Sequence, residues 1–298
     1  MKYPESAAKD KAQSPPRTGP ASPEELLAVA VAVVRPAADL ARQMRTDGVF
    51  GVSTKSTDTD VVTAADRAVE RYVAGALSAA RPGDTILGEE FGAATADGPE
   101  PAGRASDGGQ RVRWILDPID GTVNYLYDLP VCAVSLAAEV NGTVVAGVVR
   151  NIPTGGEWTA TRGGGSYADG RRMTGSEQTV FGQALLATGF GYARERRADQ
   201  ARVLAGLLPQ VRDIRRFGAA AVDLCLVAEG KIDAYYEQGL NLWDHAAGGL
   251  IAAEAGLLVT GLEGKPAGPD LVLAAPPVLY PPLHEALVAL DAAGGAGR

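Results

Sequence analysis

Two aspartates, Asp117 and Asp120, stand three residues apart at the end of an apolar run, in the segment WILDPIDGTVNY (114–125). Pro118 fixes its own φ angle and restricts the residue before it, so both carboxylates can turn to one side of the chain. The Ile119 carbonyl lies between them and is a further oxygen donor. Oxygen donors spaced in this way are the ligands that a hard divalent cation prefers.

The two residues after the second aspartate predict a site for an anion. Gly121 and Thr122 are expected to open a short helix, whose first backbone N–H groups have no partner inside the helix. Such N–H groups bind phosphate readily. A cation site beside a helix N-terminus therefore predicts a binding site for a phosphate group.

Three other segments place acids where a predicted element begins or ends: GEE (88–90), YYE (235–237) and WD (243–244). Side chains at such positions are exposed and held by a rigid element, which suits a functional site. Because the chain has only two histidines and two cysteines, carboxylates would supply nearly all metal ligands. This donor set favours Mg²⁺ or Mn²⁺ over zinc.

Each of these features, taken alone, has a simpler interpretation. An Asp-Gly pair is usually a turn, and a pair of glutamates is usually a solvated surface. Asp244 could be a helix N-cap, Thr122 could be only a helix cap, and Glu237 could pair with an arginine. The site is indicated by their combination.

Composition and charge narrow the class of partner. The 298 residues are 46% apolar and 21% charged, as in an ordinary globular protein, and the formal net charge is −8. This charge argues against binding to nucleic acid. It leaves open a phosphorylated small molecule, because a bound cation reverses the local sign of charge.

The cysteines and the chain ends predict a cytoplasmic location. Cys132 and Cys225 lie in apolar segments and are expected to be buried and reduced, with a disulfide or a metal site as alternatives. No apolar run reaches the roughly 18 residues of a membrane-spanning helix, so we expect no membrane association. Residues 1–21 lack the apolar segment of a signal peptide and are predicted to be a disordered tail.

The predicted elements indicate a layered α+β or α/β fold with two sheets. A helix with a capping box at Ser22 is expected to kink or break at Pro36, and a second helix covers roughly 62–80. An antiparallel-looking sheet and the metal site belong to an N-terminal half, 22–190, with an Asn-Gly hairpin at 141–142 and a mobile loop or hairpin over 91–113. Helices and strands then alternate through a C-terminal half, 191–298.

Together these motifs resemble the inositol monophosphatase family of Mg²⁺-dependent, lithium-sensitive phosphatases. The segments that carry the resemblance are GEE (88–90), WILDPIDGTVNY (114–125), WDHAAGGLIAAEAG (243–256), KSTDTDVVTAADRAVE (55–70) and GAAAVDLCLVAEGKIDAYYE (218–237). They cover the chain from about 23 to 290, in the order in which the family has them. The character of their sequences is similar to the actinobacterial type of the family. The resemblance implies an αβαβα sandwich of the inositol monophosphatase and fructose-1,6-bisphosphatase type, and a homodimer.

The resemblance also implies a set of metal ligands. Glu89, Asp117 and the Ile119 carbonyl resemble the ligands of a first Mg²⁺. Asp117, Asp120 and Asp244 resemble those of a second, and Glu89 is similar to a ligand of a weaker third ion. Mn²⁺ is a possible substitute.

The remaining roles are carried over in the same way. Thr122 and Asp66 resemble the pair that orients and deprotonates the attacking water, with Glu89 beside them as a catalytic residue. The backbone amides of Gly121 and Thr122 resemble the phosphate site. The positions that contact a sugar-like ring are matched by Asp120, Ala220 and Glu237.

The function that follows is hydrolysis of inositol 1-phosphate by a metal-activated water, without a phosphoenzyme. The alternatives within enzymes are related hydrolases of histidinol phosphate, fructose 1,6-bisphosphate, NADP or 3′-phosphoadenosine 5′-phosphate. An alternative of another class is a non-catalytic regulatory binding protein. The arginine-rich run at 194–202 is interpreted as a solvated helix face, or as a segment near a partner's active site in a dimer.

Overall fold

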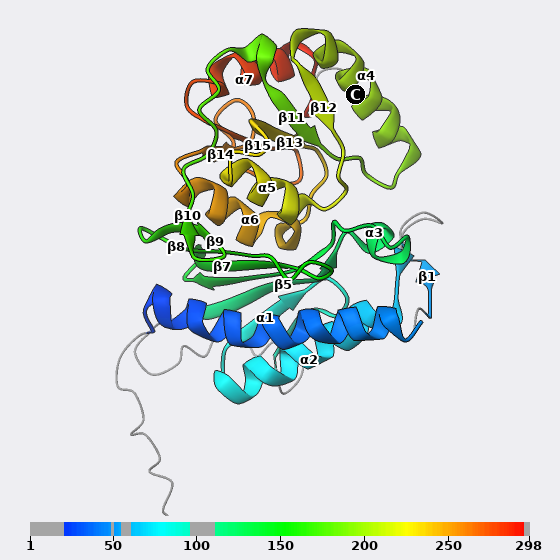
Figure 1. Ribbon diagram of the computed structural model, residues 1–298, viewed down its shortest axis with the longest axis vertical. Helices are drawn as coiled ribbons and strands as arrows, with labels where there is room; N and C mark the ends of the chain where they lie inside the picture. Colours follow the sequence, from blue (N-terminus) through cyan, green and yellow to red (C-terminus); the bar gives the residue numbers. More distant parts are fainter. Residues whose placement is uncertain (1–20, 49–50, 55–60, 96–110, 295–298) are drawn as a thin grey trace, which may run out of the picture.

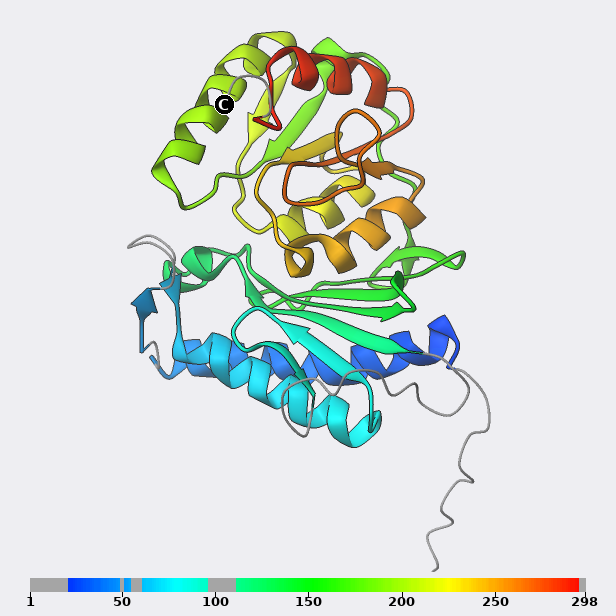
Figure 2. The same ribbon diagram turned by 180° about the vertical axis from the view of Figure 1, so that it is seen from behind.

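The computed structural model describes residues 21–48, 51–54, 61–95 and 111–294 (Figure 1). The predicted tail, apart from Ala21, and most of the predicted loop at 91–113 lie outside these residues. Three layers of helices alternate with two sheets, as the two opposite views in Figures 1 and 2 show. The predicted αβαβα sandwich is therefore confirmed.

The helices of the three layers come from different parts of the chain. The outer layer of the first sheet holds α1 and α2, the middle layer holds α5 and α6, and the far layer holds α4 and α7 (Figure 1). Their bounds are α1 (Pro23–Thr46), α2 (Ala64–Ala80), α3 (Thr122–Leu126), α4 (Arg194–Leu207), α5 (Ala220–Ala228), α6 (Leu242–Glu254) and α7 (Tyr280–Ala289). Short 3₁₀ turns cover Phe181–Gln183 and Leu208–Gln210.

The first sheet has eight strands in the order β10-β9-β8-β7-β6-β5-β3-β4. Their bounds are β3 (Thr85–Gly88), β4 (Gly92–Thr95), β5 (Val112–Asp120), β6 (Ala133–Val140), β7 (Thr143–Asn151), β8 (Glu157–Thr161), β9 (Gly165–Ala168) and β10 (Arg171–Arg172). The predicted Asn141-Gly142 hairpin joins β6 and β7, with both residues at positive φ. The prediction of an antiparallel sheet needs one correction, because β3 and β5 pair in parallel. The chain turns back through β4 at the sheet edge and enters β5 in the direction of β3.

The second sheet has five strands in the order β12-β11-β13-β15-β14. Their bounds are β11 (Leu185–Thr188), β12 (Asp213–Arg215), β13 (Ala234–Glu237), β14 (Leu258–Thr260) and β15 (Val272–Ala275). β11 pairs in parallel with β12 and β13, and the other pairs are antiparallel. A separate two-stranded sheet joins β1 (Ser53–Thr54) to β2 (Val61–Val62). The division into halves at 190/191 stays a prediction.

The first helix corrects another expectation. Its capping box is present, since the Glu25 N–H donates to Ser22 Oγ at 3.3 Å and the Ser22 N–H donates to Glu25 Oε2 at 3.1 Å. The helix then continues through Pro36 as one element. Val33, Val34 and Ala37 around this proline are buried, and their packing offsets the one backbone hydrogen bond that proline removes.

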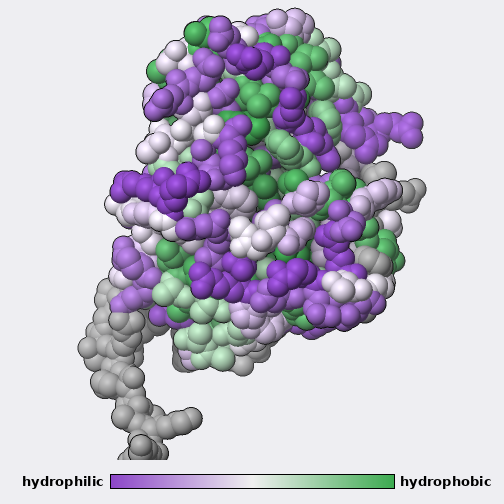
Figure 3. All heavy atoms as spheres, in the orientation of Figure 1, coloured by the Kyte–Doolittle hydropathy of each residue, from purple (hydrophilic) through white to green (hydrophobic). Residues whose placement is uncertain are grey.

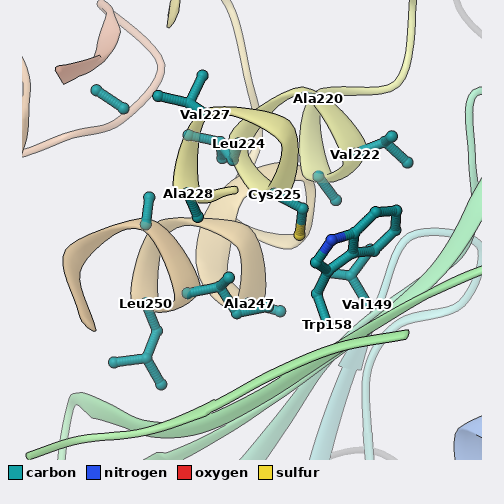
Figure 4. Close-up of a cluster of buried hydrophobic side chains, with 14 of the residues drawn as sticks. Val149, Trp158, Ala220, Val222, Leu224, Cys225, Val227, Ala228, Ala247 and Leu250 are labelled. Carbon is teal, nitrogen blue, oxygen red and sulfur yellow. The ribbon is translucent and has the colours of Figure 1, made fainter. Parts of the chain in front are cut away.

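Apolar residues fill the spaces between the layers. One core lies between α1, α2 and the first sheet, another surrounds α5 and α6, and a third backs the second sheet. Figure 4 shows Trp158 and Val149 of the first sheet packed toward Cys225 of α5 and Ala247 of α6. Both cysteines are buried and free, as predicted.

Among the residues that the structure describes, none of the helices is both long and apolar enough to cross a bilayer. On the face in Figure 3, hydrophilic and hydrophobic residues are interspersed over both halves of the molecule.

Candidate active site

A β-bulge at the end of β5 turns both aspartates of the DPID segment to one side. Asp117 pairs with Ser135 of β6 and Asp120 pairs with Ala133, so β5 advances three residues where β6 advances two. Side chains three apart on a regular strand would point to opposite faces, and one extra residue returns them to the same face. A bulge also tolerates Pro118 in a central strand.

The bulge leads directly into a buried hydrogen-bond network at Asp66. The Thr122 hydroxyl lies 3.2 Å from Asp66 Oδ1 and 3.1 Å from the Ile119 carbonyl oxygen. Asp66 Oδ2 accepts from the Thr63 N–H at 2.8 Å and from the Thr63 hydroxyl at 2.5 Å. The start of α2 is thereby bonded to the end of β5, and the predicted Asp66–Thr122 pair is in hydrogen-bond contact.

Glu89 lies in the turn between β3 and β4, and another acid holds this turn in place. Glu70 of α2 is 3% exposed and accepts the N–H groups of Glu90 at 2.9 Å and Phe91 at 3.0 Å. A Cβ on Gly88 would lie 2.0 Å from Glu70 Oε1, so a glycine makes room for the carboxylate. Burial raises the pKa of Glu70 to about 7.

Sequence reasoning missed Glu70, although a signal for it was present. It follows Asp66 by one helical turn, next to Val69 on the apolar face of the predicted helix at 62–80. A lone acid on a buried helix face requires a partner, because an unpaired buried carboxylate is costly. In this structure the partners are backbone N–H groups of the turn that carries Glu89.

Asp120 joins the first sheet to the middle layer. Its carboxylate oxygens accept the N–H groups of Ala220 at 3.1 Å and Ala221 at 2.8 Å, at the start of α5. Ala219 precedes this helix and offers no side-chain cap, so Asp120 takes that function. Burial raises the pKa of Asp120 to about 7, although the α5 N–H groups stabilise its ionised form.

The remaining acids of the site interact with one another. Burial raises the pKa of Asp117, and repulsion from Glu89, Asp120 and Asp244 raises it further. Burial also raises the pKa of Asp244, followed by repulsion from Glu89 and Asp120. These groups share a low-dielectric space in which several negative charges are costly.

The simpler interpretation of Asp244 as an N-cap is not what the structure shows. The N-cap of α6 is Asn241, and its N–H donates to Asp244 Oδ2 at 2.6 Å. Asp244 is thus the third residue of the helix and faces the pocket described below. A capping-box acid leaves its second oxygen available to another partner.

Glu237 occupies the end of β13 and is bonded by a buried tyrosine. The Tyr235 hydroxyl donates to Glu237 Oε2 at 2.6 Å. Burial raises the pKa of Glu237 to about 7, while Tyr235 and the nearby Arg216 act in the opposite direction. A Cβ on Gly189 would lie 2.0 Å from the Glu237 carboxylate, so the position of this carboxylate also requires a glycine beside it.

A single pocket of about 520 Å³ collects these side chains. Of the predicted site residues, those that line it are Glu89, Asp117, Ile119, Asp120, Gly121, Thr122, Ala220, Glu237 and Asp244. Asp66 is not among the lining residues and lies behind Thr122. In the described part of the chain, no three His, Cys, Asp or Glu side chains are grouped tightly enough to hold a metal ion as they stand.

The pocket wall also contains residues that the sequence interpretation left out. The segment from Gly189 to Ala193 lines it, together with Arg196 and Arg216. Arg196 belongs to the run at 194–202 that was interpreted as a solvated face or a partner contact. Arg196 is exposed, as a solvated face predicts, and it also lines the pocket of its own chain at the start of α4, while contact with a partner stays a prediction.

Comparison with known proteins supports the resemblance seen in the motifs. A model described as "Inositol monophosphatase family" matches residues 22–292. "Inositol-1-monophosphatase" of Mycobacterium leprae is 44% identical over 89% of this chain and 94% of its own length. "Nus factor SuhB" of Pseudomonas aeruginosa is 37% identical over 81% of this chain and 87% of its own.

A solved structure gives the same result for the fold. The structure titled "Mycobacterium tuberculosis SuhB" aligns with a TM-score of 0.75 and 39% identity, over 91% of this chain and 98% of that one. The predicted family resemblance and the layered fold are confirmed by these matches.

Proposed function

We propose that this chain, which belongs to the inositol monophosphatase family and is a phosphatase, hydrolyses inositol 1-phosphate to inositol and phosphate. The observation that carries the proposal is the bulged end of β5. The bulge directs the side chains of Asp117 and Asp120 into the pocket that Glu89 and Asp244 also line. The hydrogen-bonded pair of Thr122 and Asp66 lies beside them. Relatives named inositol-1-monophosphatase support the choice of substrate.

The family generally uses divalent metal ions, and the donor set of the pocket fits Mg²⁺, with Mn²⁺ as a substitute. Every candidate ligand is an oxygen atom, and mutual repulsion among the acids would be relieved by a cation. Glu89, Asp117 and the Ile119 carbonyl would hold one ion. Asp117, Asp120 and Asp244 would hold another, with Glu89 contributing to a weaker third.

Binding requires the carboxylates to converge, since they are not tightly grouped as they stand. Asp120 can serve both α5 and a cation, because each carboxylate oxygen has two lone pairs. When bound, the ions supply an acidified water and neutralise the phosphate charge.

The chain itself supplies the route for the proton. The Thr122 hydroxyl donates to Asp66 Oδ1, which leaves the lone pairs of Thr122 Oγ1 free to accept a proton from water. Asp66 then receives the hydroxyl proton, while Thr63 holds its other oxygen. The Gly121 and Thr122 N–H groups would donate to the phosphate oxygens, as at other helix N-termini.

The other end of the pocket would bind the polyol. Tyr235 occupies Glu237 Oε2, so Glu237 Oε1 can accept a substrate hydroxyl. Asp120 and Ala220 lie beside it along the start of α5. Acceptors of this kind suit a ring that presents several hydroxyl groups.

Phosphate release by the purified protein tests the proposal. Inositol 1-phosphate, histidinol phosphate, fructose 1,6-bisphosphate, NADP and 3′-phosphoadenosine 5′-phosphate would be compared, each with Mg²⁺ and with EDTA. We expect the highest kcat/KM for inositol 1-phosphate and loss of release in EDTA. A higher kcat/KM for another ester would keep the chemistry and overturn the substrate.

A second candidate function follows from the relative named "Nus factor SuhB". A regulatory binding protein could retain the fold without needing the acids. Asp117→Asn separates the two, because it should abolish phosphate release while leaving the fold and any partner binding intact. The homodimer, lithium sensitivity and cytoplasmic location stay predictions.

A further inference from the structure

We infer that Ser135 of β6 is a positioning residue of the proposed metal site, and that its hydroxyl donates a hydrogen bond to the Asp117 carboxylate when a cation is bound. The inference rests on the proposed function for the role of Asp117 as a metal ligand. Ser135 is not among the residues that line the pocket, so it would act on the site only through Asp117.

The strand register places Ser135 beside the aspartate. Ser135 lies directly opposite Asp117 in the antiparallel pair of β5 and β6, at the last position before the bulge. Directly opposed residues in such a pair have their side chains on the same face of the sheet, with Cβ atoms about 4.5–5.5 Å apart. Ser135 is therefore the cross-strand neighbour of a carboxylate that the bulge turns into the pocket.

The other direct neighbours of Ser135 within the sheet have no side-chain acceptor. Ala133 and Ala137 flank it on the same face of β6, and Val149 lies opposite it on β7. These three residues belong to the apolar core around α5 and α6. Of the two flanking and two opposed residues, Asp117 is thus the one whose side chain can accept a hydrogen bond.

The Ser135 hydroxyl is buried without a partner. The residue is 1% exposed, and its Oγ makes no hydrogen bond to any residue that the structure describes. Burial of an unpaired hydroxyl is unfavourable. Alanine occupies the flanking positions 133 and 137 on this face without that cost. The hydroxyl therefore favours a state of the site in which it has an acceptor.

Asp117 can accept this hydrogen bond and ligate a cation as well. Its Oδ1 accepts the Ile119 N–H at 3.0 Å, and no donor is bonded to its Oδ2 among the described residues. An ionised carboxylate offers about four lone-pair sites on its two oxygens. Carboxylates that ligate metals in proteins are themselves hydrogen-bonded, which fixes their orientation. In the proposed site Asp117 serves two ions, so its orientation affects both.

Calorimetric titration of Mn²⁺ into the EDTA-treated and desalted protein tests the role. Ser135→Ala should bind Mn²⁺ about tenfold more weakly than the wild type, as expected when a metal ligand loses its hydrogen-bond partner. The change removes one oxygen atom from a face where alanine already packs, so the variant should fold.

Ser166→Ala is the matched control. Ser166 of β9 is 0% exposed, and its hydroxyl also has no partner in the described part of the chain. It lies opposite Ala160, and β8, β7 and β6 separate its strand from β5. This variant should keep the wild-type Kd for Mn²⁺.

Thermal unfolding separates a positioning role from a purely structural one. In EDTA, Ser135→Ala should be at least as stable as the wild type, because it removes an unpaired buried hydroxyl. At a fixed saturating Mn²⁺ concentration, the stabilisation by the metal should be about 1.4 kcal/mol smaller, which is a tenfold change in Kd. Equal destabilisation with and without Mn²⁺ would indicate a packing defect and overturn the role.

The outcome is independent of the substrate. A higher Kd for Mn²⁺ in Ser135→Ala alone would support the role even if an ester other than inositol 1-phosphate were hydrolysed. An unchanged Kd would overturn it, even if inositol 1-phosphate were the substrate. An equal loss in Ser166→Ala, or absence of Mn²⁺ binding in the wild type, would overturn it as well.

Discussion

Two fully buried aspartates near the pocket differ in the hydrogen-bond partners of their carboxylates. Asp66 of α2 and Asp223 of α5 are both 0% exposed. The oxygens of Asp66 accept hydrogen bonds from Thr63 and Thr122. Neither carboxylate oxygen of Asp223 has a hydrogen-bond partner within the described chain.

The two aspartates therefore differ in what stabilises an ionised carboxylate, because only Asp66 accepts hydrogen bonds from side-chain and backbone donors. Burial raises the pKa of Asp223 well above its usual range, and repulsion from Glu237 and Asp120 adds to it. Asp223 therefore favours its neutral form, and of the two acids Asp66 is the one hydrogen-bonded to Thr122.

The largest expected effect that tests this comparison is loss of the base. Asp66→Asn should lower kcat for inositol 1-phosphate by about 10²–10⁴-fold, the range for general acid–base catalysis. Steady-state kinetics at saturating Mg²⁺ would measure it, with circular dichroism as the check on folding. A loss below about fivefold would remove Asp66 from the proton route.

Thr122 offers a matched pair of variants with the next largest effect. Thr122→Val keeps the shape and removes the hydroxyl, so kcat should fall by about 10²-fold. Thr122→Ser keeps the hydroxyl and should stay within about tenfold of the wild type. If both variants were equally impaired, Thr122 would be a packing residue and the relay would be wrong.

The raised pKa values predict a pH dependence of stability in the metal-free protein. The pKa values of Glu70 and Glu237 rise from 4.5 to about 7 on folding. The folded chain then binds protons more tightly than the unfolded chain, so the free energy of unfolding falls as pH rises from about 4.5 to about 7. The acids with lowered pKa values, such as Glu157 and Glu229, titrate below this window.

Urea unfolding in EDTA at pH 5 and pH 8 would measure this trend. Glu70→Gln should flatten it, since it removes one of the titrating groups while keeping the side chain's shape. Equal or greater stability of the wild type at pH 8 would contradict the assignment.

The smallest expected effect concerns Asp223. Asp223→Asn removes a carboxyl group whose ionisation is disfavoured by burial in the folded chain. The melting temperature at pH 8 should therefore rise by roughly 2 °C. The same change at Asp66 should lower it, because a capping carboxylate is lost. A large fall for Asp223→Asn would mean that its carboxylate has a partner in the working protein.

The comparison also shows where sequence reasoning reaches its limit. Asp117, Asp120 and Thr122 could be found because their spacing in one segment is itself a chemical signal. The bulge that turns the two aspartates to one side could not, since it depends on the register with β6. Likewise β3 was not expected beside β5 in parallel, because strand pairing is decided by contacts far apart in sequence.

The sequence analysis omitted two residues of the site, Glu70 and Arg196, for different reasons. Glu70 could have been identified as an acid on an apolar helix face. Arg196 could not, because an arginine in a charged run is typical of a solvated face. Only the placement of α4 against the pocket distinguishes it from Arg194.

In the proposed site, acids from both predicted halves of the chain bind the same cations. Mn²⁺ binding, counted by electron paramagnetic resonance, tests it most directly in the wild type and in Asp244→Asn. Because Asp244 comes from α6 and Asp117 from β5, we expect the variant to lose one of the wild-type Mn²⁺ ions or to bind it about 100-fold more weakly. An unchanged number of ions and an unchanged Kd would contradict the account.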